Sequence, residues 1–139
     1  MTSYDVDWTT LPEPRDDGAA DHLAGLMLPD LPLPSTDGAD LSLAMQAGIS
    51  VVYAFPKTGQ PGTDMPQGWD AIPGARGCTP QGCAYRDRMD DLRAAGAGQV
   101  FGLSTQSTAW QAEAQARLHL PFALLSDHRL DLAQQLDLP

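Results

Sequence analysis

The chain has few cysteines, few basic residues and no long apolar run, and each shortage excludes a class of protein. Two cysteines in 139 residues are too few for the disulfide framework of a small secreted fold. Only 8 basic residues stand against 18 acidic ones, a formal net charge of -10, which argues against nucleic acid and anionic membranes as partners. No run approaches the ~20 apolar residues of a membrane span, and the acidic N-terminus lacks a signal-peptide pattern. We therefore expect a cytoplasmic protein whose thiols stay reduced.

The sequence divides into an arm and a domain. Residues 1–28 have little periodicity and many acidic residues, so we expect an N-terminal arm with a short helix near Ala19–Leu28. Residues 29–139 are expected to form one domain, because 42% of the chain is hydrophobic and can build a core. Where the domain begins, three prolines exclude a helix, and Asp37-Gly38 predicts the turn of a small hairpin.

Apolar segments that alternate with helical patterns predict the fold class. Ile49–Phe55 is a continuous apolar run, typical of a strand buried on both faces. Two more strands and three helices follow the same reasoning: strands at Gln99–Ser104 and 121–127, and helices at Pro80–Ala95, 107–118 and 129–136. Strands and helices that alternate in this way indicate an α/β domain with a mostly parallel sheet.

The first predicted helix has a clear start and a clear apolar face. Thr79 suits the N-cap and Pro80 the first helical position. Tyr85, Met89 and Leu92 fall on one helical stripe and are expected to face the core.

Helical spacing also predicts two side-chain placements. Arg86 and Asp90 are four residues apart, so we expect them to form an ion pair. In the last helix Leu130, Ala133 and Leu136 are expected to face inward.

Both cysteines lie in "GCTPQGCAYRD", beside the predicted start of the first helix. Cys78 also follows the strand Ile49–Phe55, at the carboxyl end of the sheet, where the chemistry of α/β folds is concentrated. Backbone N–H groups and the helix dipole favour a thiolate at a helix N-terminus, and Arg76 is two residues upstream. The pattern indicates redox chemistry, while two inert buried cysteines and a metal site remain alternatives.

The spacing of the two cysteines restricts how they can react. On an intact helix, five residues give a rise of about 7.5 Å and a rotation of about 140°, which a disulfide cannot bridge. Either Cys78 stays outside the helix or the first turn unwinds, which Pro80 and Gly82 would ease. If Thr79 is the N-cap, Cys78 and Cys83 occupy the two positions of a hydrophobic staple and lie close together.

A metal site has little support in the sequence. Zinc usually requires four ligands, often with Cys-x-x-Cys spacing, and the two cysteines lack that spacing. His22, His119 and His128 are scattered along the chain, and we expect them at the surface or in loops. We therefore expect no metal.

The segments "YAFPK" and "GCTPQGCAYRD", followed by "VFGLSTQSTAWQAEAQARLHLPFALLSD", resemble peroxiredoxins of the Q type, also called bacterioferritin comigratory proteins. The resemblance covers about Leu28 to Leu136 and agrees in both the spacing and the order of the motifs. It implies a thioredoxin-like fold with a central, mostly parallel or mixed sheet flanked by helices. It also implies reduction of hydrogen peroxide and organic hydroperoxides without an organic cofactor or a metal.

The same resemblance implies roles for the two cysteines. Cys78 would be the peroxidatic cysteine and Cys83 the resolving one, joined in a Cys78–Cys83 redox disulfide as in atypical two-cysteine enzymes. Thr79 and Gln81 match the residues that follow the peroxidatic cysteine in the family. A thioredoxin- or glutaredoxin-type reductant is implied as partner, and an intrachain disulfide is compatible with a monomer or a weak dimer.

Upstream of Cys78 the sequence departs from the family pattern. The family has proline seven residues and threonine three residues before the cysteine, where this chain has Ala71 and Ala75. Here 21 residues separate Pro56 from Cys78, so we interpret residues 57–77 as containing an insertion. Pro56 and Thr58 would then supply the proline and the hydroxyl from before it.

The sequence also departs from the family at its end. The family continues with further strands, one of which carries an arginine that activates the thiolate, and a last helix, whereas this sequence stops at Pro139. We therefore expect a C-terminally truncated domain in which Arg76 or Arg86 is the nearby cation. These departures leave an alternative function, a thiol-disulfide sensor or regulatory module without efficient peroxidase turnover.

Overall fold

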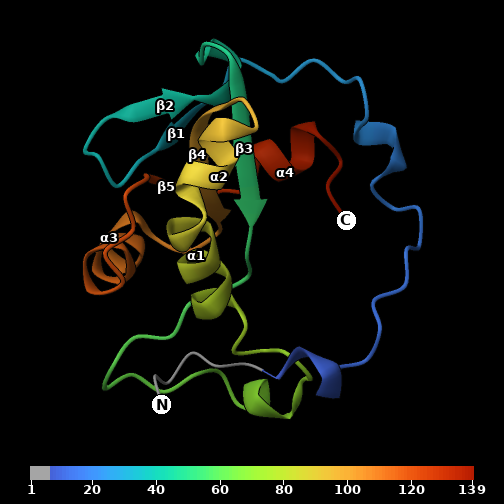
Figure 1. The fold of residues 1–139 in the computed structure, drawn as a ribbon, viewed down its shortest axis with the longest axis vertical. Helices are drawn as coiled ribbons and strands as arrows, with labels where there is room; N and C mark the ends of the chain where they lie inside the picture. The colour runs from blue at the N-terminus through green and yellow to red at the C-terminus, as the bar shows by residue number, and fades with distance from the viewer. Residues whose placement is uncertain (1–6) are drawn as a thin grey trace.

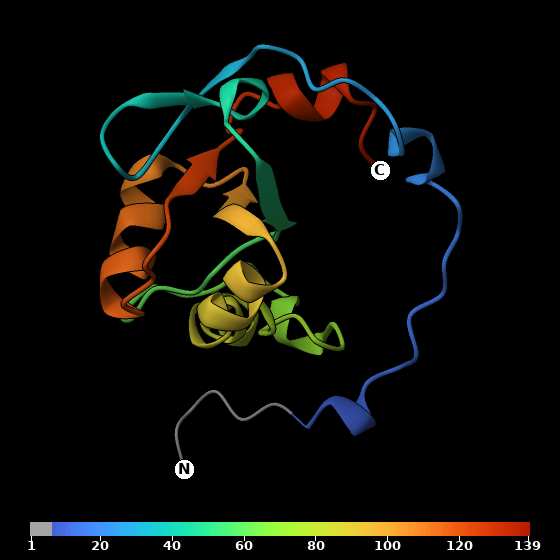
Figure 2. The same ribbon diagram turned by 45° about the horizontal axis from the view of Figure 1, so that its top comes forward.

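The structure is a computed structural model that describes residues 7–139. Residues 1–6 of the predicted arm lie outside the described part. The rest of the arm runs along the outside of the domain (Figures 1 and 2). It contains two short 3-10 helices, η1 (Trp8–Thr10) and η2 (Asp21–Leu23), so the helix predicted near Ala19–Leu28 is reduced to one 3-10 turn. The His22 ring, through Nε2, is 2.8 Å from the carbonyl oxygen of Leu136 and tethers the arm to the end of the chain.

The predicted hairpin is confirmed. Strands β1 (Pro32–Pro34) and β2 (Asp40–Ser42) pair in antiparallel fashion, and a 3-10 helix, η3 (Leu43–Met45), follows. Leu33 is buried on the face of the hairpin that packs against the sheet. The hairpin therefore covers one side of the main sheet.

The main sheet has three parallel strands in the order β3-β4-β5. Their bounds are β3 (Ile49–Ala54), β4 (Ala97–Ser104) and β5 (Leu124–Ser126). The connections contain η4 (Trp69–Ala71), α1 (Cys78–Asp87), α2 (Met89–Ala94) and α3 (Thr108–Arg117), and α4 (Asp131–Gln135) ends the domain. The predicted alternation of strands and helices in a parallel α/β sheet is confirmed.

Two apolar clusters lie on opposite faces of the sheet, because side chains alternate along each strand. Helices α1 and α2 cover one face, and the hairpin and α4 lie on the other (Figure 2). The first cluster contains both cysteines: Tyr53, Phe55, Cys78, Cys83, Val100, Leu118, Leu120, Phe122 and Leu124. The second consists of Leu33, Leu43, Phe101, Leu103, Ala123, Leu125 and Leu132. The cysteines therefore belong to the core between α1 and the sheet.

The prediction that β3 is buried on both faces is wrong. Tyr53 is 4% exposed, whereas Ile49 is 63% and Val52 is 37% exposed. Within the described part of the chain β3 pairs only with β4, so it is an edge strand, and its buried side chains face α1. A continuous apolar run predicts a strand, but it does not predict whether one or both faces of that strand are buried.

The first predicted helix is two helices. Helix α1 ends at Asp87, Arg88 interrupts the helix with a φ of -107° and a ψ of 14°, and α2 begins at Met89. The apolar stripe is nevertheless confirmed: Tyr85, Met89 and Leu92 all pack against the first cluster.

Two side-chain predictions about the helices are wrong. Arg86 pairs with Asp87 rather than Asp90, with Nε 2.7 Å from Oδ1. In α4 Leu130 is 44% exposed instead of facing inward and Leu132 is buried at 3%, whereas Leu136 packs against the second cluster as predicted. The helix begins at Asp131, and Leu130 precedes it in the left-handed region with a φ of 61°, which rotates the buried face away from the predicted stripe.

Candidate active site

Cys78 is the first residue of α1, and its side chain is buried. The prediction that Thr79 is the N-cap is wrong: Gly77 occupies that position and accepts a hydrogen bond from the N–H of Gln81 at 2.9 Å. Pro80 is therefore the third residue of the helix rather than the first, and it still lies in the first turn, where its missing N–H would have had no helical partner. The turns of the preceding loop continue directly into the helix, and this continuity moves the start to Cys78.

Cys83 lies on the same helix, so the predicted staple between the two cysteines is not formed. Both thiols are free and buried, and both residues belong to the cluster between α1 and the sheet. Because they are five residues apart on continuous helix, their side chains point in directions about 140° apart. Of the two routes to a disulfide, only unwinding of the first turn of α1 remains.

The thiol of Cys78 is buried, and burial raises its pKa above the ordinary value. The backbone N–H groups of Lys57 and of Cys78 itself hydrogen-bond to the sulfur and act in the opposite direction. Of these two donors, the N–H of Cys78 belongs to the helix start, and the N–H of Lys57 comes from the segment after β3. Their effect is smaller than that of burial, so the net shift is opposite to the activation that the sequence predicted.

Thr58 is held by two side chains that lie far from it in sequence. Its N–H and its hydroxyl donate to Oε1 of Gln106 at 3.0 and 3.2 Å. Its carbonyl accepts from Nε2 of Gln106 at 3.3 Å and from Nε1 of Trp110 at 2.8 Å. The residue is 5% exposed, so these bonds satisfy a buried segment of backbone that would otherwise be costly.

This clamp brings the segment after β3 to the side of the first helix. Lys57 directly precedes Thr58, and its N–H reaches the Cys78 thiol. Although 21 residues separate Pro56 from Cys78, the backbone at Lys57 thus lies at the cysteine. However, the hydroxyl of Thr58 donates to Gln106, and Pro56 is exposed. No local sequence pattern connects Gln106 or Trp110 with Thr58, so their role in holding Thr58 is not predictable from the sequence.

The two arginines considered in the sequence analysis are engaged elsewhere. Arg76 pairs with Asp70, with Nε 2.6 Å from Oδ1, and both side chains are largely exposed. Arg86 donates from Nη1 to the carbonyl of Leu118 at 2.7 Å, which connects the end of α1 to the end of α3. Among the described residues, neither arginine is a cause of the pKa shift of Cys78.

A third arginine, Arg117 at the end of α3, also lies near the site. It donates from Nη2 to the carbonyl of Gly59 at 2.9 Å and pairs with Glu113 through Nε at 2.7 Å. It fixes the start of residues 57–77 against α3, next to the Thr58 clamp. Arg117 and Gly59 are 58 residues apart, so no local sequence pattern predicts this contact.

Tyr53 packs in the same apolar cluster as both cysteines. Its ring stacks on Tyr85 with centroids 4.4 Å apart. Burial is the main reason that the pKa of its hydroxyl lies far above the ordinary value. The nearby Tyr85, Cys83 and Cys78 raise this pKa further. Gly102 on β4 and Gly82 on α1 make room for this ring: a Cβ would lie 2.9 Å and 3.3 Å, respectively, from the Tyr53 hydroxyl oxygen. Two glycines thus allow α1 to approach the sheet closely.

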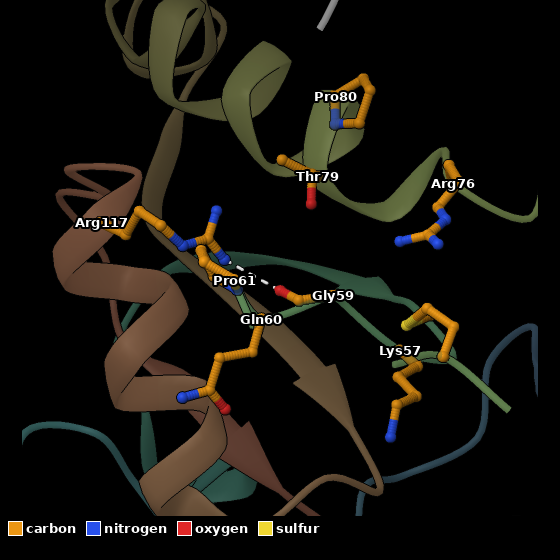
Figure 3. A pocket seen from close by; sticks show the side chains of 9 residues that line it. Lys57, Gly59, Gln60, Pro61, Arg76, Thr79, Pro80 and Arg117 are labelled. Carbon is orange, nitrogen blue, oxygen red and sulfur yellow. Dashed lines mark hydrogen bonds between the residues drawn. The ribbon is translucent and has the colours of Figure 1, made fainter. Parts of the chain in front are cut away.

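A cavity of about 490 Å³ opens beside the first turn of α1 (Figure 3). Arg76, two residues before Cys78, and Thr79, the residue after it, both line it. The remaining lining residues are Lys57, Gly59, Gln60, Pro61, Met65, Pro80 and Arg117. Its size suits a small organic molecule.

The described residues contain neither a metal-binding cluster nor a membrane-spanning helix. No group of three or more His, Cys, Asp or Glu side chains in the described residues could hold a metal ion. His22, His119 and His128 are exposed, as predicted. None of the described helices is both long and apolar enough to span a bilayer.

Comparison with known proteins assigns the chain to a class. The sequence pattern of the Redoxin family matches residues 23–139, so the chain belongs to the redoxin family. Within this family the relatives are peroxiredoxins of the Q or Bcp type. Peroxiredoxin bcp1 of Schizosaccharomyces pombe is 30% identical over 131 residues, covering 91% of this chain and 58% of that protein. Peroxiredoxin Bcp of Escherichia coli K12 is 34% identical over 113 residues, covering 81% and 62%.

Solved structures agree with this assignment. Peroxiredoxin Q of Xanthomonas campestris superposes with a TM-score of 0.63 at 28% identity, covering 81% of this chain and 65% of that one. Peroxidoxin BcpB of Mycobacterium tuberculosis, at 24% identity and a TM-score of 0.64, supports the fold. The predicted thioredoxin-like fold and the resemblance to Q-type peroxiredoxins are confirmed. The chain spans about 58–65% of the length of these relatives.

Proposed function

We propose that the chain is a thiol-dependent peroxidase in which Cys78 reacts with hydroperoxides and Cys83 resolves the product. The observation that carries the proposal is the position of the Cys78 thiol. It lies at the first turn of α1, accepts hydrogen bonds from the N–H groups of Lys57 and Cys78, and is flanked by residues that line a cavity. Membership of the redoxin family and the likeness to Q-type peroxiredoxins support the same activity.

In the first step the deprotonated sulfur of Cys78 attacks the terminal oxygen of the hydroperoxide. An S–O bond forms while the O–O bond breaks, and the departing alkoxide takes up a proton to leave as an alcohol, or as water when the substrate is hydrogen peroxide. The sulfur is oxidised by two electrons to a sulfenic acid. The N–H groups of Lys57 and Cys78 stabilise the negative charge on sulfur before the attack.

In the second step the thiol of Cys83 attacks the sulfenic sulfur, an S–S bond forms and water leaves. The first turn of α1 must unwind for this, because both cysteines lie on continuous helix. Gly82, the fifth residue of the helix, has a flexible backbone, which eases this remodelling. A thioredoxin- or glutaredoxin-type dithiol would then reduce the disulfide by exchange, supplying two electrons.

The proposal is tested by the loss of free thiols after addition of hydrogen peroxide. We expect two thiols to disappear in the wild type. Cys83→Ser should stop at a sulfenic acid on Cys78, detectable by mass spectrometry, and Cys78→Ser should keep its Cys83 thiol. If the wild type and Cys78→Ser react equally slowly, Cys78 is not the peroxidatic residue. Peroxide consumption coupled to a thioredoxin system then separates an enzyme, with steady turnover, from a sensor that is oxidised once.

A further inference from the structure

The basic residues of this acidic chain are concentrated at one cavity. The chain has 8 basic and 18 acidic residues, yet three of the nine residues that line the cavity of about 490 Å³ are basic and none is acidic. These three are Lys57, Arg76 and Arg117. A cavity with this lining attracts anions, in contrast to the net charge of the chain.

Two of the three charges face the cavity directly. In Figure 3 the guanidinium groups of Arg76 and Arg117 lie on opposite sides of the cavity, and the hydroxyl of Thr79 points into it from α1. The ammonium of Lys57 lies instead over the Trp110 ring, 4.4 Å from its centroid. The two guanidinium groups and the hydroxyl together offer hydrogen-bond donors suited to a carboxylate.

Both arginines have carboxylate partners, Asp70 for Arg76 and Glu113 for Arg117, and neither acid lines the cavity. In the Arg76–Asp70 pair the side chains are 58% and 67% exposed, so solvent weakens this ion pair and a second carboxylate can compete for the guanidinium of Arg76. Arg117 also donates to the carbonyl of Gly59, so it contributes mainly positive charge to the cavity, and Arg76 is the main hydrogen-bond donor for a ligand.

Most of the cavity lining comes from residues 57–77, the segment in which this sequence departs from the pattern it resembles. Six of the nine lining residues belong to it: Lys57, Gly59, Gln60, Pro61, Met65 and Arg76. Gly59 allows Arg76 to approach, because a Cβ at Gly59 would lie 3.2 Å from Nη1 of Arg76. Two of the three basic residues of the cavity, Lys57 and Arg76, thus come from this segment, and none comes from the cysteine motif.

We propose that this cavity binds the carboxylate end of an anionic organic hydroperoxide and presents its O–O bond to Cys78. The inference rests on the proposed peroxidase activity and adds to it the class of substrate. Arg76 and the hydroxyl of Thr79 hold the carboxylate, Arg117 adds positive charge, and Thr79 connects the cavity to the first turn of α1, where Cys78 lies. Neutral hydroperoxides gain none of this attraction, so the site discriminates by charge.

The kinetic test compares ω-hydroperoxypentanoate with its methyl ester, which is nearly equal in size but neutral. We expect the wild type to have the higher kcat/KM for the acid, and Arg76→Gln to reduce the ratio of acid to ester about three- to fivefold, the effect of one partly exposed charge. Arg88→Gln is the matched control, because Arg88 pairs with Asp91 on an exposed helix surface and does not line the cavity. Its ratio should equal that of the wild type. An equal preference for acid and ester in the wild type would overturn the proposal.

A binding measurement keeps this inference separate from the peroxidase proposal. Cys78→Ser cannot react, so its amide NMR signals can be followed during titration with ω-hydroxypentanoate and, in parallel, its methyl ester. We expect the acid to shift the signals of Gly59 and Thr79, the ester to shift them little, and added Arg76→Gln to weaken the acid response. If the acid binds but no variant consumes peroxide, the anion site stands and the peroxidase proposal fails. If acid and ester behave alike, the anion site is refuted whatever the activity.

Discussion

Oε1 of Gln106 accepts two hydrogen bonds from Thr58, one from the N–H at 3.0 Å and one from the hydroxyl at 3.2 Å. Gln106 follows β4, and Thr58 follows β3, so the pair joins the carboxyl ends of two neighbouring parallel strands. Lys57, which directly precedes Thr58, directs its N–H at the thiol of Cys78. Gln106 is therefore a positioning residue for the thiol. It holds Thr58, and Thr58 fixes the neighbouring N–H of Lys57.

Gln106→Leu should slow the reaction of Cys78 without unfolding the protein. The substitution removes the acceptor for the buried N–H of Thr58, and the Lys57 N–H loses its fixed direction. One hydrogen bond to the sulfur contributes about 1–1.5 kcal/mol, so we expect alkylation of Cys78 by iodoacetamide to be about tenfold slower at neutral pH. The midpoint of the rate against pH should rise, since the thiolate loses a donor. The Cys83→Ser background makes Cys78 the only thiol that reacts.

Gln115→Leu is the matched control for this experiment. Gln115 lies on α3 and, like Gln106, donates from Nε2 to a backbone carbonyl, that of Phe122 at 2.9 Å, but it does not contact Thr58. We expect it to lower the free energy of unfolding and to leave the pH profile of Cys78 unchanged. Equal pH profiles for both variants would mean that Gln106 has only a structural role.

The reaction of Cys78 should accelerate as the pH rises, with a midpoint above the ordinary thiol value. Burial raises the pKa of this thiol, and the N–H groups of Lys57 and Cys78 offset only part of the effect. The rate of alkylation of Cys78 in the Cys83→Ser background, folded and in denaturant, measures both midpoints. A folded midpoint below that of the unfolded chain would contradict this expectation.

The same shift predicts how stability depends on pH. Because the folded pKa of Cys78 lies above the unfolded one, its contribution to stability is fully present below the unfolded pKa and is lost as the pH rises through the folded pKa. Urea unfolding of the wild type and of Cys78→Ser, at neutral pH and at alkaline pH, tests the sign. The wild type should lose more stability than Cys78→Ser toward alkaline pH.

Gly102→Ala should destabilise the fold by about 1–3 kcal/mol, the usual cost of overpacking a core. A Cβ at this position would lie 2.5 Å from Cδ2 of Leu124 and 2.9 Å from the Tyr53 hydroxyl oxygen, so the Tyr53 ring must move. Gly98→Ala on the same strand is the control: its Cβ would meet only ordinary contacts, the nearest 3.4 Å from the carbonyl oxygen of Ile49. Urea denaturation should therefore give a clearly lower midpoint for Gly102→Ala than for Gly98→Ala, and equal midpoints would disprove the packing argument.

Much of the fold can be predicted from local patterns. The hairpin around Asp37-Gly38, the three strands and the order of the helices follow from turn residues and from apolar periodicity, because these signals depend on neighbours in the chain. Element ends are less secure. Thr79 is a good N-cap by residue type, yet the helix begins at Cys78 because the preceding turns continue into it. Likewise the apolar run of β3 does not reveal that one of its faces is exposed.

The sequence by itself determined that Cys78 and Cys83 lie at the start of one helix near the carboxyl end of a parallel sheet, because their spacing and the surrounding apolar patterns are local. Only the tertiary structure decided that Cys78 belongs to the helix and which groups surround its thiol. The clamp of Gln106 on Thr58 and the placement of Arg117 across the cavity from Arg76 bring together residues 41 or more positions apart, and they depend on how strands and helices pack. The net shift of the pKa of Cys78 belongs to the same category, since burial is a property of the packed core.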